Sequence, residues 1–208
     1  ADPVSLQEEL DRVMPVLEEL LTWDIEISVD TSKAELARQA LILGVDIIND
    51  ISALSFDSDI AIHVAQHDAK LVLMHMRGTP KTMQNDLLNI DMVSDVNIFL
   101  KERAELAEKH GVKRENIIID PGIGFGKSLK DNIDILKHVD TFKNNGYHLL
   151  IGASRKSMIG MISAAEVEDR LPGSLAIACA CAKRGVDILR VHDVAETIQA
   201  LEVMERIW

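Results

Sequence analysis

Residues 116–128 read Asn116-Ile117-Ile118-Ile119-Asp120-Pro121-Gly122-Ile123-Gly124-Phe125-Gly126-Lys127-Ser128, and the fold and the site are both inferred from this stretch. Three consecutive isoleucines are typical of a strand that is buried on both faces. The strand ends at Asp120, and a buried carboxylate needs a partner because its desolvation is costly. The glycines that follow allow the backbone to approach a ligand closely. We therefore expect a pocket in which Asp120 meets a ligand.

Two common glycine motifs do not fit this loop. A phosphate-binding P-loop has four residues between its first glycine and Gly-Lys-Ser, but three residues separate Gly122 from Gly126. The dinucleotide-binding motif has glycines spaced G-x-G-x-x-G, and here they are spaced G-x-G-x-G. Taken alone, the loop is explained equally well by turn geometry and by ligand binding.

The composition is that of a soluble globular protein. The chain has 208 residues, 47% of them hydrophobic, which is enough for one domain with a substantial core. A net charge of -12 argues against nucleic-acid and anionic-membrane partners, so any anion site must be local. Cys179 and Cys181 are interpreted as small buried residues of a reducing cytoplasm, where we expect the protein to be located.

Hydrophobic periodicity predicts a leading helix over 5–21 and then six strand–helix units. The strands are expected at 25–30, 46–50, 70–75, 116–120, 147–152 and 186–191. The helices are expected at 32–43, 58–67, a segment ending near Gly111, 129–140, 170–184 and from 194 onward, and 76–89 is expected to be a long loop. The predicted helix-start caps are Ser5 with Glu8, Ser32 with Glu35, Ser128 with Asp131 and Asp193 with Glu196.

Alternating strands and helices predict a parallel sheet, which is either an open doubly wound sheet or a closed (β/α)₈ barrel. We favour the α/β barrel because polar residues mark the carboxyl end of every predicted strand, and in a barrel these ends meet at one mouth. In an open sheet only those near the switch point would share a site. A barrel needs eight units, so we expect the first two to lie upstream of Ala1 and residues 1–208 to form a single, N-terminally incomplete domain.

The polar residues at the strand ends divide into two chemical groups. Any one of them alone could simply cap a helix or lie in solvent. Together, Asp30, Asn49 and Asp120 supply acceptors that suit a flat heterocycle with amino and ring N–H donors. Arg190 and His192 precede the last helix, where barrels often bind phosphate. The residues therefore suggest a nitrogen heterocycle that bears a phosphate. The other polar strand ends are His75, Ser154, Arg155 and Lys156.

Six segments of the chain resemble the dihydropteroate synthase family, a family of pterin-binding TIM barrels. They occur in the family's order and extend over essentially the whole chain. The segments are Val29-Asp30-Thr31-Ser32, Ile48-Asn49-Asp50-Ile51, Met74-His75-Met76-Arg77-Gly78-Thr79-Pro80, Asp120 to Lys127, Ser154-Arg155-Lys156-Ser157 and Arg190-Val191-His192-Asp193.

The resemblance implies a role for particular residues. Lys156, Asp120 and Arg190 are the implied catalytic residues, and Arg190 and His192 are implied to hold a diphosphate. Phe125, Ser154 and Lys156 are implied to border p-aminobenzoate. The implied pterin site consists of Asp30, Asn49, Asp120 and Lys156, with Ile51, Met74, Phe125 and Gly152 around the ring. Mg²⁺ is the implied cofactor, but the family's metal-binding asparagine would lie upstream of Ala1, so no metal ligand is expected in this chain.

The implied activity is a transferase reaction of folate biosynthesis, in which dihydropterin diphosphate and p-aminobenzoate are condensed. The resemblance also implies a homodimer and a sulfonamide target. Two alternatives stay open: a methyltransferase domain acting on methyltetrahydrofolate, and a pterin-binding module without catalysis. The Arg190-Val191-His192 run and the Ser-Arg-Lys-Ser run argue against the methyltransferase. The two missing strand–helix units keep the non-catalytic module open.

Overall fold

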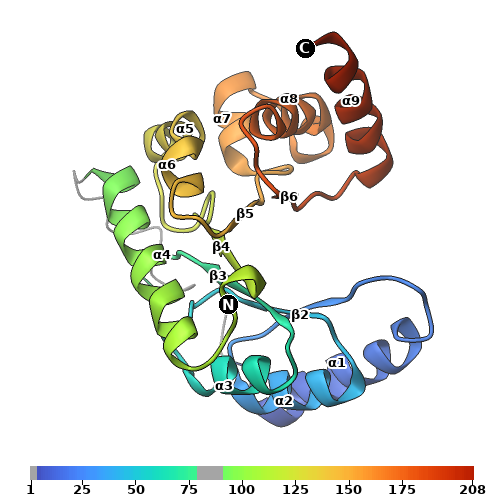
Figure 1. Ribbon diagram of the computed structural model, residues 1–208. Helices are drawn as coiled ribbons and strands as arrows, with labels where there is room; N and C mark the ends of the chain where they lie inside the picture. The colour runs from blue at the N-terminus through green and yellow to red at the C-terminus, as the bar shows by residue number, and fades with distance from the viewer. Residues whose placement is uncertain (1–3, 79–90) are drawn as a thin grey trace. The chain divides into compact units, whose positions relative to one another are not determined.

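The computed structural model describes residues 4–78 and 91–208. Helices and strands alternate along the chain (Figure 1), and the hydrogen-bonded strand order is β1-β2-β3-β4-β5-β6. β1 pairs with β2, β2 with β3 and β5 with β6, and all three pairs are parallel, as the alternation predicted. The strands are β1 (Ser28–Asp30), β2 (Ile47–Asp50), β3 (Lys70–Met74), β4 (Ile117–Asp120), β5 (His148–Ile151) and β6 (Ile188–Leu189).

The described chain divides into two compact units. The first comprises Ala1–Met76 and Ile98–Ile119. It contains α1 (Leu6–Leu20), α2 (Ala34–Leu43) and α3 (Asp59–Gln66), and α2 packs against both α1 and α3 (Figure 1). The helix α2 ends at Gly44, whose φ of 108° lets its N–H turn back to the last helical carbonyls.

The second unit comprises Arg77–Asn97 and Asp120–Trp208. The helices α8 and α9 pack against each other in this unit. Apart from the start of α4, the helices of this unit come after β4 in the sequence. They are α5 (Leu129–Lys137), α6 (Val139–Lys143), α7 (Ser157–Ser163), α8 (Leu171–Ala182) and α9 (Val194–Ile207). The helix α4 (Met92–Lys109) includes residues of both units.

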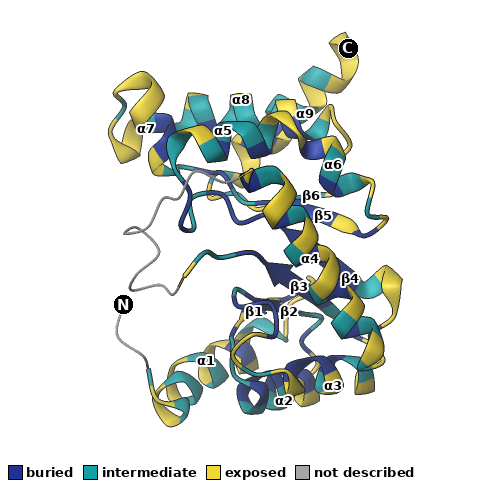
Figure 2. Ribbon diagram, turned by 90° about the vertical axis from the view of Figure 1, so that its left-hand side faces the viewer, coloured by how far each residue is buried: buried dark blue, intermediate teal, exposed yellow. Residues whose placement is uncertain are grey.

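The three isoleucines of β4 are buried as predicted, with at most 1% of each exposed. All four residues of β4 are buried, and so are the last four of β3 (Figure 2). Burial on both faces explains why these strands lack the alternating pattern of a half-exposed sheet. In the described residues no helix is long and apolar enough to cross a membrane.

Several predicted elements differ from the observed ones, and the strand expected over 186–191 comprises only Ile188–Leu189. The helix expected over 129–140 ends at Lys137, and His138 separates it from α6. The short helix α7 was not predicted at all. The strand expected over 25–30 starts only at Ser28, and Ile25 is 54% exposed. The loop expected over 76–89 lies largely outside the described residues.

Two of the four predicted caps also differ. The side chain of Ser5 accepts a hydrogen bond from the Glu8 N–H, which is one half of the expected capping box, while the Glu8 carboxylate pairs with Arg12. The Ser128–Asp131 capping box forms in full. Lys33, rather than Ser32, is the N-cap of α2. Asp193 is the N-cap of α9 by position, but its side chain makes no capping hydrogen bond and pairs instead with Arg155.

Candidate active site

Two predicted pterin contacts of the first unit lie next to each other at the ends of paired strands. Asp30 ends β1 and is opposite Asn49 of β2. The amide nitrogen of Asn49 donates a hydrogen bond to Asp30 Oδ1 at 2.9 Å. This bond fixes the orientation of the amide, so the Asn49 oxygen is the atom with which it can accept a hydrogen bond from a ligand. Asn49 is buried and Asp30 is exposed.

The neighbouring acid, Asp50, stabilises the turn that follows β2. It is fully buried and accepts hydrogen bonds from Ser52 N (2.8 Å), Ser52 Oγ (2.7 Å) and Leu54 N (2.6 Å). These bonds hold a turn in which Ala53 and Leu54 have positive φ angles of 49° and 63°. Burial raises the pKa of Asp50, and the hydrogen bonds from the turn oppose that rise. Asp50 therefore shapes the segment that carries Ile51.

The remaining residues predicted in the first unit are partly or fully buried. Met74 at the end of β3 is buried, and Ile51 is half-buried. The ring of His75 packs edge-on against Phe99, with 5.0 Å between the ring centroids. His75 is therefore part of the packing beneath the strand ends, which the strand-end pattern could not show.

In the second unit, Asp120 lies in a desolvated position, as the sequence predicted. It is 6% exposed, and its Oδ1 accepts a hydrogen bond from Gly122 N at 2.7 Å. Burial raises the pKa of Asp120 to about 6, against the Gly122 hydrogen bond and the positive charges of Lys127, Lys156 and Arg190. At neutral pH the side chain is therefore a carboxylate, and it is surrounded by cations.

The glycine loop after β4 needs its glycines for backbone geometry. Gly122, Gly124 and Gly126 have φ angles of 68°, 87° and 67°, which side chains other than glycine rarely adopt. A Cβ atom on Gly124 would also lie 3.4 Å from Cδ of Lys156. The loop places the ring of Phe125 under the Lys156 ammonium, with 4.3 Å from Nζ to the ring centroid, within cation–π range.

Two residues that sequence reasoning left without a role hold this loop. Lys127 is 8% exposed, and its Nζ donates to the carbonyls of Gly122 (2.9 Å) and Phe125 (3.1 Å). Burial lowers the pKa of Lys127 to about 7, against the charges of Asp120 and Asp131. Asn132, also buried, accepts from Gly124 N at 2.7 Å and donates to the Lys127 and Ser128 carbonyls. A lysine or an asparagine near a helix start usually lies in solvent, so only the structure reveals these roles.

Lys156 interacts electrostatically with Asp120 and with Arg190 of the same unit. Burial lowers the pKa of Lys156; the charge of Asp120 acts to raise it, and that of Arg190 to lower it further. Arg190 follows β6, and its backbone N–H donates to the Ile151 carbonyl at 3.0 Å. A Cβ atom on Gly152 would make ordinary contact with the side chain of Arg190, at 3.8 Å.

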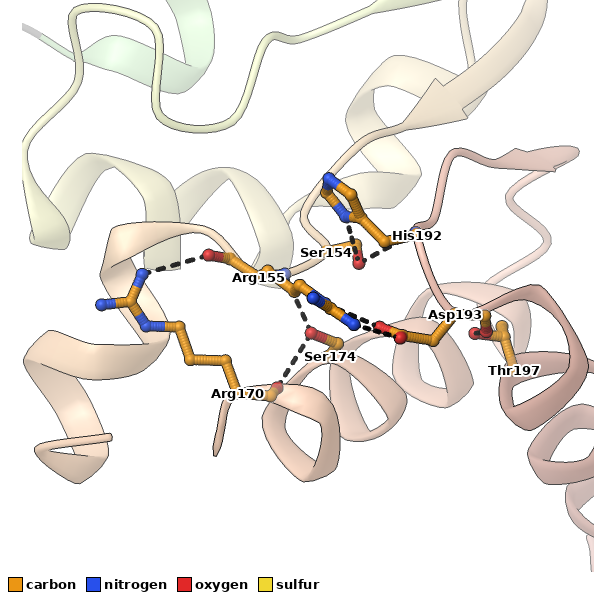
Figure 3. Close-up of polar contacts among 7 residues, drawn as sticks. All are labelled: Ser154, Arg155, Arg170, Ser174, His192, Asp193 and Thr197. Atoms are coloured by element: carbon orange, nitrogen blue, oxygen red, sulfur yellow. Dashed lines mark hydrogen bonds and ion pairs between the residues drawn. The ribbon is translucent and has the colours of Figure 1, made fainter. Parts of the chain in front are cut away.

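Ser154 and His192 are in direct contact (Figure 3). The buried Ser154 hydroxyl lies 2.9 Å from His192 Nδ1 and accepts a hydrogen bond from the His192 backbone N–H at 3.3 Å. A residue predicted to border p-aminobenzoate, Ser154, is thus hydrogen-bonded to a residue predicted to hold a diphosphate, His192. The structure places Asp120, Phe125, Lys156, Ser154, Gly152, Arg190 and His192 in the second unit and Asp30, Asn49, Ile51 and Met74 in the first.

The described residues contain no group of three or more His, Cys, Asp and Glu side chains that could hold a metal ion. In the group predicted to hold a diphosphate, Arg190 supplies a permanent positive charge.

A buried carboxylate, a lysine over an aromatic ring and an arginine with a histidine near a helix start suit a charged heterocyclic substrate. The family model described as pterin binding enzyme matches residues 1–192. The chain therefore belongs to the family of pterin-binding enzymes.

Within that family, its relatives are dihydropteroate synthases. The chain is 43% identical over 210 residues to that of Synechocystis sp., covering 100% of this chain and 73% of the relative. It is 42% identical over 206 residues to that of Escherichia coli, covering 99% and 73% of the two chains.

Solved structures agree in fold. The Yersinia pestis dihydropteroate synthase with a sulfonamide drug complex superposes with a TM-score of 0.93 at 39% identity, covering 99% of this chain and 75% of that one. The Thermus thermophilus enzyme in complex with 4-aminobenzoate gives a TM-score of 0.93 at 38% identity, covering 99% and 80%. These likenesses confirm the predicted α/β fold class of the (β/α)₈ barrel.

Proposed function

We propose that this chain condenses 6-hydroxymethyl-7,8-dihydropterin diphosphate with p-aminobenzoate to give 7,8-dihydropteroate and diphosphate in folate biosynthesis. The observation that carries the proposal is the charged group of the second unit: Asp120 is buried among Lys127, Lys156 and Arg190, with Phe125 under Lys156. Solved relatives named in the presence of pteroic acid, and in complex with 4-aminobenzoate and with 6HMPPP, support it. The activity makes the protein a transferase.

In this proposal Asp120 is the main pterin acceptor. Its ionised oxygens accept hydrogen bonds from the ring's amino and N–H donors, and Lys156 donates to a ring acceptor. In the first unit, Asn49 is proposed to supply a further hydrogen-bond acceptor for the pterin, and Asp30 is proposed to supply a negative charge. Ile51, Met74, Phe125 and Gly152 are proposed to flank the ring.

Arg190 and His192 are proposed to hold the leaving diphosphate. They precede α9, whose N-terminus favours negative charge. Ser154, Phe125 and Lys156 are proposed to border p-aminobenzoate.

The proposed reaction requires positioning and charge stabilisation, without a nucleophilic side chain. The bond between the pterin methylene carbon and oxygen breaks, and its electron pair leaves with the diphosphate. The pterin ring delocalises the resulting cation, and the carboxylate of Asp120 stabilises its charge. The neutral amine of p-aminobenzoate then forms the new C–N bond and loses a proton. Holding the two reactants in line supplies much of the rate enhancement.

Mg²⁺ stays part of the proposal as a cation that neutralises diphosphate oxygens when it is bound. None of the described residues is assigned to it. Within this chain, Arg190 is proposed to stabilise the negative charge of the leaving diphosphate, and a protonated His192 would add to this stabilisation.

Product formation tests the proposed function. Purified protein is incubated with dihydropterin diphosphate, p-aminobenzoate and Mg²⁺, and 7,8-dihydropteroate and diphosphate are quantified together. Equal amounts of both products support the synthase. Pterin binding without either product would favour the non-catalytic module, and turnover of methyltetrahydrofolate would favour the methyltransferase.

The pH dependence of pterin binding tests the role of Asp120. A proton and the pterin donors compete for the same carboxylate, and its pKa is raised to about 6. Affinity is therefore expected to be constant above pH 6 and to fall by about tenfold per pH unit below it. Isothermal titration with a bare pterin between pH 8 and pH 5 measures this. The Asp120→Asn protein should show no such slope, and a flat profile for the unaltered chain would contradict the assignment.

We propose further that the protein is a cytoplasmic homodimer in which α8 and α9 meet the second copy. A groove of about 370 Å³ between these helices is lined by apolar side chains that include Ala176, Ala180 and Val203. At its end, Ile207 is 70% exposed and Trp208 is 77% exposed. Such exposed apolar surface is typical of an interface.

Sedimentation equilibrium tests the dimer. The chain is expected at twice its own mass, and Val203→Glu is expected to shift it to the monomer, because a charge would be buried in the interface. Val203 is 56% exposed, so the substitution does not disturb the core of one copy. A monomeric unaltered protein would contradict the proposed dimer.

A further inference from the structure

The loops that follow β5 and β6 are joined by a second contact beside the Ser154–His192 pair. Arg155 Nε donates to Asp193 Oδ2 at 3.0 Å, and Arg155 Nη2 donates to Asp193 Oδ1 (Figure 3). Two parallel N–H to oxygen bonds fix both the distance and the relative orientation of the two groups. Arg155 lies between Ser154 and Lys156, and Asp193 directly follows His192, so each partner is adjacent to residues of the proposed site.

The backbone of Arg155 is in an unusual conformation. Its φ angle is 56°, in the left-handed region that a residue with a Cβ seldom adopts. Such a conformation persists only where the surroundings hold it, and it is frequent at functional sites. At this position it sets the directions in which Ser154 and Lys156 leave the strand end.

Contacts from outside the loop hold that conformation. The Arg155 N–H donates to Ser174 Oγ at 2.9 Å, and the Arg155 carbonyl accepts from Arg170 Nη1 at 3.1 Å (Figure 3). Ser174 in turn donates its hydroxyl to the Arg170 carbonyl at 2.9 Å. Backbone and side chain of Arg155 are therefore fixed by different partners, and the side chain is used for the bond to Asp193.

Asp193 is anchored equally well. Its carbonyl accepts hydrogen bonds from Thr197 N at 3.0 Å and Thr197 Oγ1 at 2.7 Å in the first turn of α9. Its carboxylate makes no bond to the N–H groups of that turn, although a side chain at this position usually does so. The carboxylate is committed to Arg155 instead.

We propose that Arg155 and Asp193 are positioning residues. They fix the loop proposed to border p-aminobenzoate relative to the loop proposed to hold the diphosphate. The pair itself touches neither substrate. It keeps Ser154 within hydrogen-bonding distance of His192 and aligns the loop of Lys156 with the loop of Arg190. The inference rests on the proposed function, since that function assigns the substrates to these four residues.

Charge-removing variants test the pair. Arg155→Gln and Asp193→Asn remove its charges, asparagine is isosteric with aspartate, and both changes are combined in a double variant. Lys143→Gln is the matched control, because Lys143 pairs with Asp187 in the same unit at 2.7 Å with similar exposure. Pyrophosphate and bare-pterin affinities are measured by titration, kcat and KM by product formation, and folding by thermal melting.

Each single variant is expected to weaken pyrophosphate binding and to lower kcat by about tenfold or more. Bare-pterin affinity should stay within twofold, and the double variant should lose no more than the worse single variant, because both changes break one contact. The control should behave as the unaltered chain. Losses that multiply in the double variant, a parallel loss of pterin affinity, or unchanged pyrophosphate binding would each overturn the proposal.

The binding measurements keep this test separate from the proposed function. An unaltered chain that forms no dihydropteroate contradicts the synthase assignment, and pyrophosphate affinity alone then decides whether the pair positions the anion site. A variant that melts far below the unaltered chain is replaced by Arg155→Lys, which keeps the charge and loses the parallel bonds. It should lie between the glutamine variant and the unaltered chain in pyrophosphate affinity.

Discussion

Replacing Asp120 with asparagine is expected to weaken pterin binding by about 2–4 kcal/mol, roughly 30- to 1,000-fold. The amide presents a donor to ring donors and removes the charge that the surrounding cations stabilise. The Gly122 N–H, which now donates to Asp120, also competes for the one remaining acceptor oxygen. Isothermal titration with a bare pterin at pH 7.5 measures the loss, and Asn49→Ala should show a smaller one.

The matched control for this variant is Asp134→Asn. Asp134 is an acid on α5 whose partner, Lys130, is exposed, so the change should leave pterin binding as it is. Thermal melting of both variants separates a lost contact from a lost fold. If Asp120→Asn retains pterin affinity within a factor of three, Asp120 is not the pterin acceptor.

The second large effect is expected for Arg190→Ala. It should weaken the binding of dihydropterin diphosphate by about 2–5 kcal/mol, because a desolvated charge pair loses one partner. The bare pterin, which lacks the diphosphate, should be affected far less. Parallel titrations with the two ligands measure the difference, and Arg12→Ala, an exposed arginine on α1, serves as the control.

A similar loss for the two ligands would show that Arg190 supports the fold rather than the diphosphate. The effect should also shrink at high salt if the arginine is reached by solvent. Comparing the titrations at low and high ionic strength therefore shows how far the arginine is desolvated in the complex.

The features predicted correctly from the sequence are those set by neighbouring residues. Three adjacent isoleucines predict burial on both faces whatever surrounds them, and the Ser128–Asp131 capping box depends on residues three apart. The glycines after Asp120 all adopt positive φ, which is a property of the residue itself. The alternation of strands and helices predicts the parallel order for the same reason.

The features that were missed depend on contacts that exist only in the folded chain, whether their partners are distant or near in the sequence. Asp193 resembles a helix cap until Arg155, 38 residues earlier, takes its carboxylate. Lys127 resembles a solvated lysine until the loop folds back and brings two carbonyls to its Nζ. The short β1 and the break at His138 likewise follow from packing rather than from composition. The resemblance implies which residues form the site, whereas the residues that hold them in place are found only in the structure.

The order of the strands has a consequence for how the protein is made. Every strand is hydrogen-bonded to the strands next to it in the sequence. As the chain is synthesised from its N-terminus, each new strand therefore finds its partner already present, and pairing closes only one strand–helix unit at a time. Between additions, the newest strand has an unpaired edge that can bind another chain. The risk of aggregation is thus governed by how quickly the next unit leaves the ribosome.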